Sequence, residues 1–169
     1  HWKFDPPAKE SGKRVLVVER FDRHWTEERR LLRLPQEDCC QALSVPPGRK
    51  YESDGGPGMK RILELLKGSD EPGADRRLFL KAQILFWLLG ATDGHAKNFS
   101  IFLRSGGQFV LALLYDVMSA QPAFDAKQLS RNKMKLAMPV GTNRHDVIDT
   151  ILPRHFIQTA EASGMSAGE

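Results

Sequence analysis

The chain has 169 residues, 41% of them apolar, so it can bury one hydrophobic core and fits one compact domain better than two. Its 25 Lys and Arg residues against 21 Asp and Glu give a net charge of +4, a modest excess that a generic solvated surface explains as well as an acidic or nucleic-acid partner does. Two adjacent cysteines suit neither a CxxC zinc site nor an ordinary disulfide, and the sequence contains no signal peptide and no apolar stretch of about 20 residues. These features predict a cytoplasmic protein without a membrane partner.

The first half of the chain is predicted to form short strands and then two helices. Apolar residues predict a strand over residues 13–20, and a second strand follows a charged turn at 30–34. Residues 36–44 are predicted to be helical up to the break at Pro46-Pro47-Gly48. An amphipathic helix is predicted over 59–67.

The glycine-rich segment 54–60 enters this second helix and has three interpretations. Backbone N–H groups at a helix start attract anions, so the segment could hold a phosphate, but it lacks the GxxxxGK[ST] spacing of a P-loop. A flexible turn is favoured over ligand binding. Contact with a protein substrate is a third alternative, and the sequence leaves it open.

The second half is predicted to be mainly helical around one hairpin. A long helix with core aromatic residues is predicted over 75–89, and two strands, 99–103 and 108–113, flank the turn Ser105-Gly106-Gly107. A packed element is predicted over 127–138, and a last helix over 146–160 is predicted to be interrupted at Pro153. The fold class predicted from these elements is α+β, mainly helical.

The loop between the long helix and the hairpin contains the residues of a phosphoryl-transfer site. Asp93 would accept the proton of the attacking hydroxyl, while the oxygens of Asn98 and of Asp116, which follows the hairpin, would hold Mg²⁺ against the phosphates of ATP. Lys97 is a candidate phosphate counter-charge. Such residues are also ordinary in loops, and Asp93-Gly94 is a common turn signal. The order of helix, polar loop, hairpin and terminal Asp favours the kinase interpretation.

Five segments in the same order closely resemble the HipA family, the serine/threonine kinase toxins of bacterial toxin–antitoxin pairs. They are VERFDR at 18–23, LPQED at 34–38, KYESDGGPG at 50–58, TDGHAKNFS at 92–100 and YD at 115–116. The resemblance implies a protein-kinase-like (HipA-type) large lobe with a hinge strand and a catalytic β-hairpin. It also implies two parts, the end of the small lobe and the hinge at 1–22 and the helical large lobe at 23–169, with the chain incomplete at both ends.

The resemblance implies a role for each matching residue. Asp93 would be the catalytic base, with Asn98 and Asp116 as metal ligands. The remaining nucleotide-binding positions would be the hinge residues Glu19, Arg20 and Phe21, Asp22 near the ribose, and the phosphate-site residues His95, Ala96, Lys97, Asn98, Tyr115 and Asp116. Ordinary protein kinases usually have a Lys where this chain has His95, and a His neutralises phosphate only when it is protonated.

The resemblance further implies partners and a cellular role. These are a HipB-like helix-turn-helix antitoxin, operator DNA contacted indirectly through that antitoxin, and an aminoacyl-tRNA synthetase as protein substrate, with glutamyl-tRNA synthetase as the case to test. Phosphorylation of the synthetase would cause growth arrest and persistence. We expect the isolated chain to transfer phosphate poorly or not at all. The alternative is a catalytically inactive, truncated kinase that acts as a nucleotide- or antitoxin-binding module.

Overall fold

The computed structural model describes residues 2–3 and 17–166, and the chain forms two compact units, His1–Pro35 and Gln36–Glu169. The division falls after Pro35, whereas the predicted lobe boundary lies between residues 22 and 23. The assignment of the two parts to kinase lobes stays a prediction. Among the described residues, no helix has both the length and the apolar character needed to cross a bilayer.

The first unit contains two short antiparallel pairs of strands. Strand β1, Trp2–Lys3, pairs with β2, Val17–Val18, and strand β3, Arg23–Trp25, pairs with β4, Leu31–Arg33. The strand predicted at 30–34 is therefore confirmed. Of the strand predicted at 13–20, residues 17–18 are extended and paired, and residues 13–16 lie outside the described residues.

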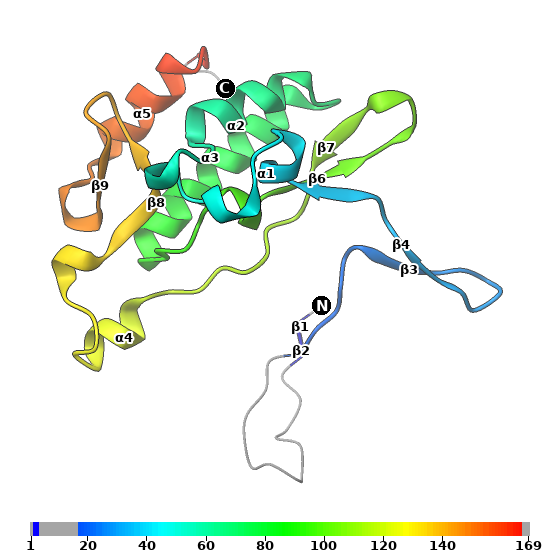
Figure 1. Cartoon of the computed structure of the whole chain (residues 1–169), viewed down its shortest axis with the longest axis horizontal. Helices are drawn as coiled ribbons and strands as arrows, with labels where there is room; N and C mark the ends of the chain where they lie inside the picture. Colours follow the sequence, from blue (N-terminus) through cyan, green and yellow to red (C-terminus); the bar gives the residue numbers. More distant parts are fainter. Residues whose placement is uncertain (1, 4–16, 167–169) are drawn as a thin grey trace, which may run out of the picture. The chain divides into compact units, whose positions relative to one another are not determined.

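The second unit contains a three-stranded antiparallel sheet in the order β5-β6-β7 (Figure 1). Strands β6, Ser100–Leu103, and β7, Phe109–Leu111, form the predicted hairpin, and β5, Gln36–Asp38, pairs with the other edge of β6. The helix predicted at 36–44 is wrong in its first part, since only α1, Cys39–Ala42, is helical there. The reason is local: the Asp38 side chain accepts a hydrogen bond from the Gln41 N–H and begins the helix after itself.

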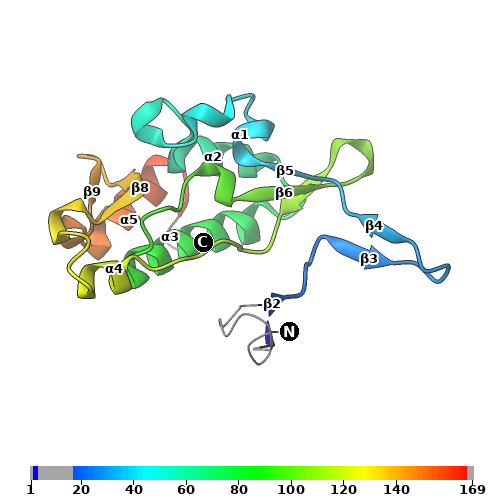
Figure 2. The same cartoon turned by 60° about the horizontal axis from the view of Figure 1, so that its bottom comes forward.

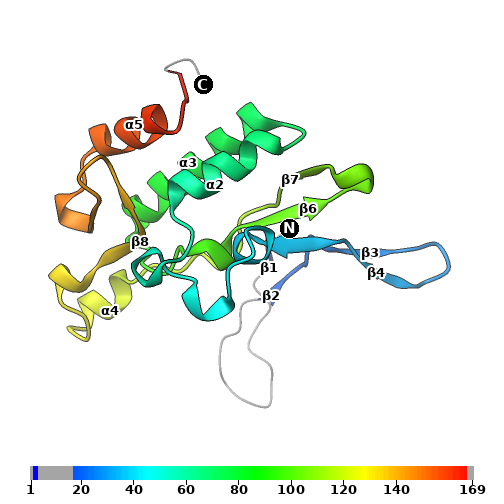
Figure 3. The same ribbon diagram turned by 45° about the horizontal axis from the view of Figure 1, so that its top comes forward.

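Helices α2, Met59–Leu65, and α3, Pro72–Leu89, lie side by side and are joined through the 3₁₀ turn Leu66–Gly68 (Figure 3). Both helix predictions are confirmed in position. The faces they turn inward contribute Met59, Ile62, Leu63, Phe79, Ala82 and Phe86 to the hydrophobic core, and other segments complete it with buried side chains such as Phe99, Met134 and Met138. The catalytic-loop candidate starts where α3 ends, so this core sets its position.

The last third of the chain packs a hairpin and a helix onto these two helices (Figure 2). A short helix, α4, Gln121–Asp125, precedes strands β8, Lys135–Val140, and β9, His145–Val147, which pair antiparallel. The packed element predicted at 127–138 is confirmed by the burial of Met134, Leu136 and Met138. The helix predicted over 146–160 is wrong in its first part, because α5 spans Pro153–Ala162 and Pro153 is its first residue.

Candidate active site

The end of α3 places the candidate catalytic loop. Gly90 adopts a left-handed conformation, with φ 62°, and its N–H bonds the carbonyls of Phe86 and Trp87, which ends the helix. The loop then crosses the ring of Phe86 at Gly94, where a Cβ atom would overlap the ring carbons. Residues Ala96–Asn98 form one 3₁₀ turn and lead into β6. The site is thus held at both ends by regular structure.

The two carboxylate oxygens of Asp93 have different surroundings. Its Oδ1 accepts a hydrogen bond of 2.5 Å from the hydroxyl of Tyr51, and His95 Nε2 lies 3.6 Å from the same oxygen. The side chain is 46% exposed, so the other oxygen, Oδ2, can receive a proton from a substrate hydroxyl. The hydrogen bond to Asp93 is the main cause that raises the pKa of Tyr51 to about 12.

Asn98 is tied to the backbone of the predicted base. Its amide Nδ2 donates to the carbonyl of Asp93 at 2.9 Å, and its backbone N–H donates to the carbonyl of His95 at 2.9 Å. The side chain is buried, and the amide N–H bond orients it so that the amide oxygen is left for another partner.

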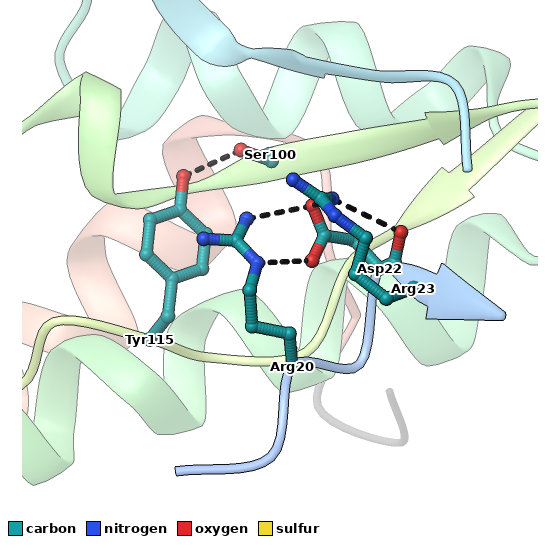
Figure 4. Close-up of polar contacts among 5 residues, drawn as sticks. All are labelled: Arg20, Asp22, Arg23, Ser100 and Tyr115. Carbon is teal, nitrogen blue, oxygen red and sulfur yellow. Dashed lines mark hydrogen bonds and ion pairs between the residues drawn. The ribbon is translucent and has the colours of Figure 1, made fainter. Parts of the chain in front are cut away.

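Tyr115 joins Asp116 to this loop. Its hydroxyl lies 2.5 Å from Ser100 Oγ (Figure 4). The same hydroxyl donates to the carbonyl of Lys97 at 2.8 Å, so the residue before Asp116 is bonded to the residue before Asn98. Burial is the main cause that raises the pKa of Tyr115 to about 12, so the phenol stays protonated at neutral pH.

Asp116 itself is exposed and has φ 56°, a left-handed conformation that few non-glycine residues adopt. Its carboxylate makes no hydrogen bond or ion pair with the described residues. The amide oxygen of Asn98 and this carboxylate are the hard oxygen donors that Mg²⁺ takes, and one or two such protein ligands are usual because phosphates and waters complete its shell. The residues present therefore fit a magnesium–nucleotide site.

His95 is buried and makes an edge contact with the Tyr51 ring, with the ring centroids 5.0 Å apart. Burial is the main cause that lowers its pKa below 6.5, so the imidazole is neutral at pH 7 and does not supply the positive charge of a lysine. Its Nδ1 is buried without a partner in the described part of the chain. An orphaned ring nitrogen in this loop fits a contact with a bound group such as nucleotide phosphate.

The predicted hinge residues lie in the first unit, where one of them, Arg20, forms an ion-pair cluster with Asp22 and Arg23 (Figure 4). Arg20 holds both carboxylate oxygens of Asp22, with Nε 2.8 Å from Oδ1 and Nη2 2.7 Å from Oδ2, and Arg23 also contacts Oδ2. These arginines, Arg20 first, lower the pKa of Asp22 to about 2. A ribose hydroxyl at Asp22 would share a carboxylate already bonded to two guanidinium groups.

The glycine-rich segment 54–60 is a packed turn. Gly56 leaves no room for a Cβ atom against the carbonyls of Arg49 and Tyr51, and the Glu52 carboxylate lies against Gly58 at the start of α2. An acidic group at that position disfavours phosphate. Of the three interpretations, the turn fits these contacts best.

A groove of about 640 Å³ lies beside the loop. It is lined by Tyr51, Ser53, Thr92, Lys133, Lys135, Leu136, Ala137, Pro139, Arg144 and Asp146. Tyr51 was missed as a site residue. Its segment KYESDGGPG was visible in the sequence, but only the fold brings the hydroxyl to Asp93.

Comparison with known proteins gives a family match over nearly the whole chain. The family model described as "HipA-like C-terminal domain" matches residues 6–169. The chain is 42% identical over 128 residues to "Putative kinase Y4mE" of Sinorhizobium fredii (strain NBRC 101917 / NGR234), covering 74% of this chain and 30% of that protein. It is 32% identical over 127 residues to "Serine/threonine-protein kinase toxin HipA" of Shewanella oneidensis, covering 68% of this chain and 29% of that protein.

The fold is similar to that of a chain in the solved complex titled "Shewanella oneidensis MR-1 Toxin Antitoxin System HipA, HipB and its operator DNA complex". The TM-score is 0.81 at 23% identity, covering 98% of this chain and 39% of that chain. At this identity the likeness shows the fold, which is kinase-like and HipA-type. The chain spans about a third of the length of the curated relatives it matches.

Proposed function

Because the chain belongs to the HipA-like C-terminal domain family, we propose that it is the catalytic part of a serine/threonine kinase toxin that uses ATP and Mg²⁺. The observation that carries the proposal is the loop in which Asp93 keeps one oxygen accessible while the Tyr115 hydroxyl links the segments of Asn98 and Asp116. Its relatives named as kinases support the same activity.

Each residue of the loop would have a separate role in phosphoryl transfer. Asp93 Oδ2 accepts the proton of a Ser or Thr hydroxyl as the hydroxyl oxygen attacks the γ-phosphorus of ATP, and the bond from that phosphorus to the β–γ bridging oxygen breaks to release ADP. Asn98 and Asp116 would hold Mg²⁺, which supplies charge neutralisation at the phosphates. Lys97 supplies positive charge from the chain, while neutral His95 contributes a hydrogen-bonding nitrogen rather than charge. Ala96 lies in the same turn and would be beside the phosphates.

Glu19, Arg20 and Phe21 would contact adenine through the backbone, with Asp22 near the ribose. The ion pairs of Asp22 support this role by keeping a charged acceptor in a defined orientation.

The groove beside Tyr51 and Thr92 is where we place the acceptor segment of the protein substrate, since its lining includes Tyr51, whose hydroxyl bonds Asp93, and Thr92, which precedes Asp93 in the chain. The substrate class is an aminoacyl-tRNA synthetase, with glutamyl-tRNA synthetase tested first. The toxin–antitoxin complex to which the fold is similar supports a HipB-like antitoxin as partner, with operator DNA contacted through it. Growth arrest and persistence would follow from synthetase inactivation.

The proposal is tested by calorimetric titration with ATP, with and without Mg²⁺, and by phosphate transfer to purified synthetase. In the protein that contains this chain, Asp93→Ala should abolish transfer and leave nucleotide affinity nearly intact, because the base acts only on the attacking hydroxyl. Asp116→Ala should weaken Mg-dependent nucleotide binding itself. Asp125→Ala, an exposed carboxylate in α4, is the matched control and should change neither.

Identical binding by the Asp93 and Asp116 variants would contradict this division of roles. No nucleotide binding and no transfer by a folded protein would contradict the kinase proposal. The alternative, a nucleotide- or antitoxin-binding module without catalysis, would then be tested by binding to the antitoxin.

A further inference from the structure

We propose that Tyr51 is a positioning residue for the catalytic carboxylate: its hydroxyl fixes Asp93 through Oδ1 and thereby turns Oδ2 toward the acceptor hydroxyl. The inference rests on the proposed function. It is based on the hydrogen bond of 2.5 Å that the Tyr51 hydroxyl donates to Asp93 Oδ1, between segments far apart in the chain. A general base acts only when it is held within hydrogen-bond reach of the proton it takes.

The backbone around Tyr51 is held firmly enough for this role. The carbonyl of Tyr51 accepts hydrogen bonds from the N–H groups of Asp54 and Gly56, at 3.1 and 2.9 Å. The preceding residue, Lys50, accepts one from the N–H of Ala96 at 3.4 Å, which ties the segment directly to the catalytic loop. Gly56 permits this turn because any side chain there would overlap the carbonyls of Arg49 and Tyr51.

The ring of Tyr51 is also packed against the loop. It meets the imidazole of His95 edge to face, at an interplanar angle of 79°, and the Lys50 ammonium lies 5.0 Å from its centroid. These contacts restrict the ring, so that the hydroxyl stays aimed at Asp93. Replacement by Phe preserves the ring and removes only the donor.

Tyr51 is the strongest donor to the Asp93 side chain among the described residues. His95 Nε2, at 3.6 Å, is beyond ordinary hydrogen-bond length. The phenol remains protonated through the physiological range and so always donates. Without this bond the half-exposed carboxylate can rotate, and the population with Oδ2 correctly placed falls.

The first experiment compares Tyr51→Phe with the unaltered protein that contains this chain, by steady-state kinetics of phosphate transfer. We expect kcat to fall about 10- to 100-fold, as for loss of alignment at a reacting group, while KM for ATP and Mg-dependent nucleotide binding stay unchanged. Ser105→Ala removes an exposed hydroxyl in the turn between β6 and β7, away from the groove, and should leave kcat unchanged. Equal kcat in the Tyr51→Phe variant and an active parent would overturn the inference.

The second experiment does not depend on activity. In ¹³C NMR of the tyrosine-labelled protein that contains this chain, the signal that is missing from the Tyr51→Phe variant belongs to Tyr51, and its ionisation can be followed directly. Asp93→Asn removes the charged acceptor and should lower the Tyr51 pKa from about 12 toward its ordinary value of 10. An unchanged Tyr51 pKa would show that Tyr51 is not bonded to the Asp93 carboxylate and would overturn the inference. If the parent protein is inactive but the Asp93→Asn change lowers the Tyr51 pKa, the result contradicts the proposed function and confirms the hydrogen bond.

Discussion

The close packing of Gly94 on Phe86 predicts that Gly94→Ala both destabilises the protein and disturbs the site. A Cβ atom at position 94 would overlap Cδ2 and Cε2 of the Phe86 ring. That ring is 1% exposed and has Phe99 beside it, with centroids 5.7 Å apart, so it cannot move aside freely. The loop must therefore shift or the core must be strained.

The expected cost follows from the overpacking of a dense core, which is about 1–3 kcal/mol. For a domain of this size each kcal/mol lowers the melting temperature by about 2–4 °C, so the expected loss is roughly 2–12 °C. Because Asp93 and His95 flank Gly94, the same shift should weaken the bond from Tyr51 and lower phosphate transfer.

The assay is thermal unfolding followed by circular dichroism, with Gly48→Ala as the matched control. Gly48 is exposed, has open space where its Cβ would lie and should tolerate Ala without loss of stability. A Gly94→Ala protein that melts at the same temperature as the Gly48→Ala protein, with phosphate transfer intact, would refute the reasoning from the packing of this loop.

Three further predictions address the surrounding structure. Tyr115→Phe removes the hydroxyl that joins Lys97 to the segment before Asp116, so it should cost about 1–3 kcal/mol in denaturant unfolding and weaken Mg-dependent ATP binding measured by calorimetry. Asp75→Ala leaves the buried N–H of Leu111 without an acceptor, whereas the Ser69 hydroxyl keeps the carbonyl of Phe109, and urea unfolding should show a loss of about 1–3 kcal/mol. Burial chiefly lowers the pKa of His155 below 6.5, so its stabilising effect is complete above pH 6.5 and is lost as the pH falls below it. Unfolding midpoints between pH 5 and 7.5 should therefore depend less on pH in His155→Gln than in the parent, and equal slopes would contradict the assignment.

Local patterns in the sequence were sufficient for α2, α3 and the β6–β7 hairpin, whereas β3 and α4 were not predicted and β5 and most of β9 lay in segments predicted to be helical. The apolar spacing of 75–89 predicted α3, and two apolar runs around Ser105-Gly106-Gly107 predicted the β6–β7 hairpin, because helix and strand periodicities depend only on neighbouring residues. The two boundary errors also had local signals. Asp38 with Gln41 is a capping pair, and Pro153 is preorganised for the first turn of a helix.

The sequence by itself determined the family and the loop that contains Asp93 and Asn98, since those residues are close together and their order is distinctive. Only the tertiary structure decided which atoms meet there. The bond from Tyr51 to Asp93, the pairing of β5 with β6 and the packing of Gly94 on Phe86 each join segments separated along the chain. Such contacts depend on how the whole core packs, and that packing is a property of all its side chains together.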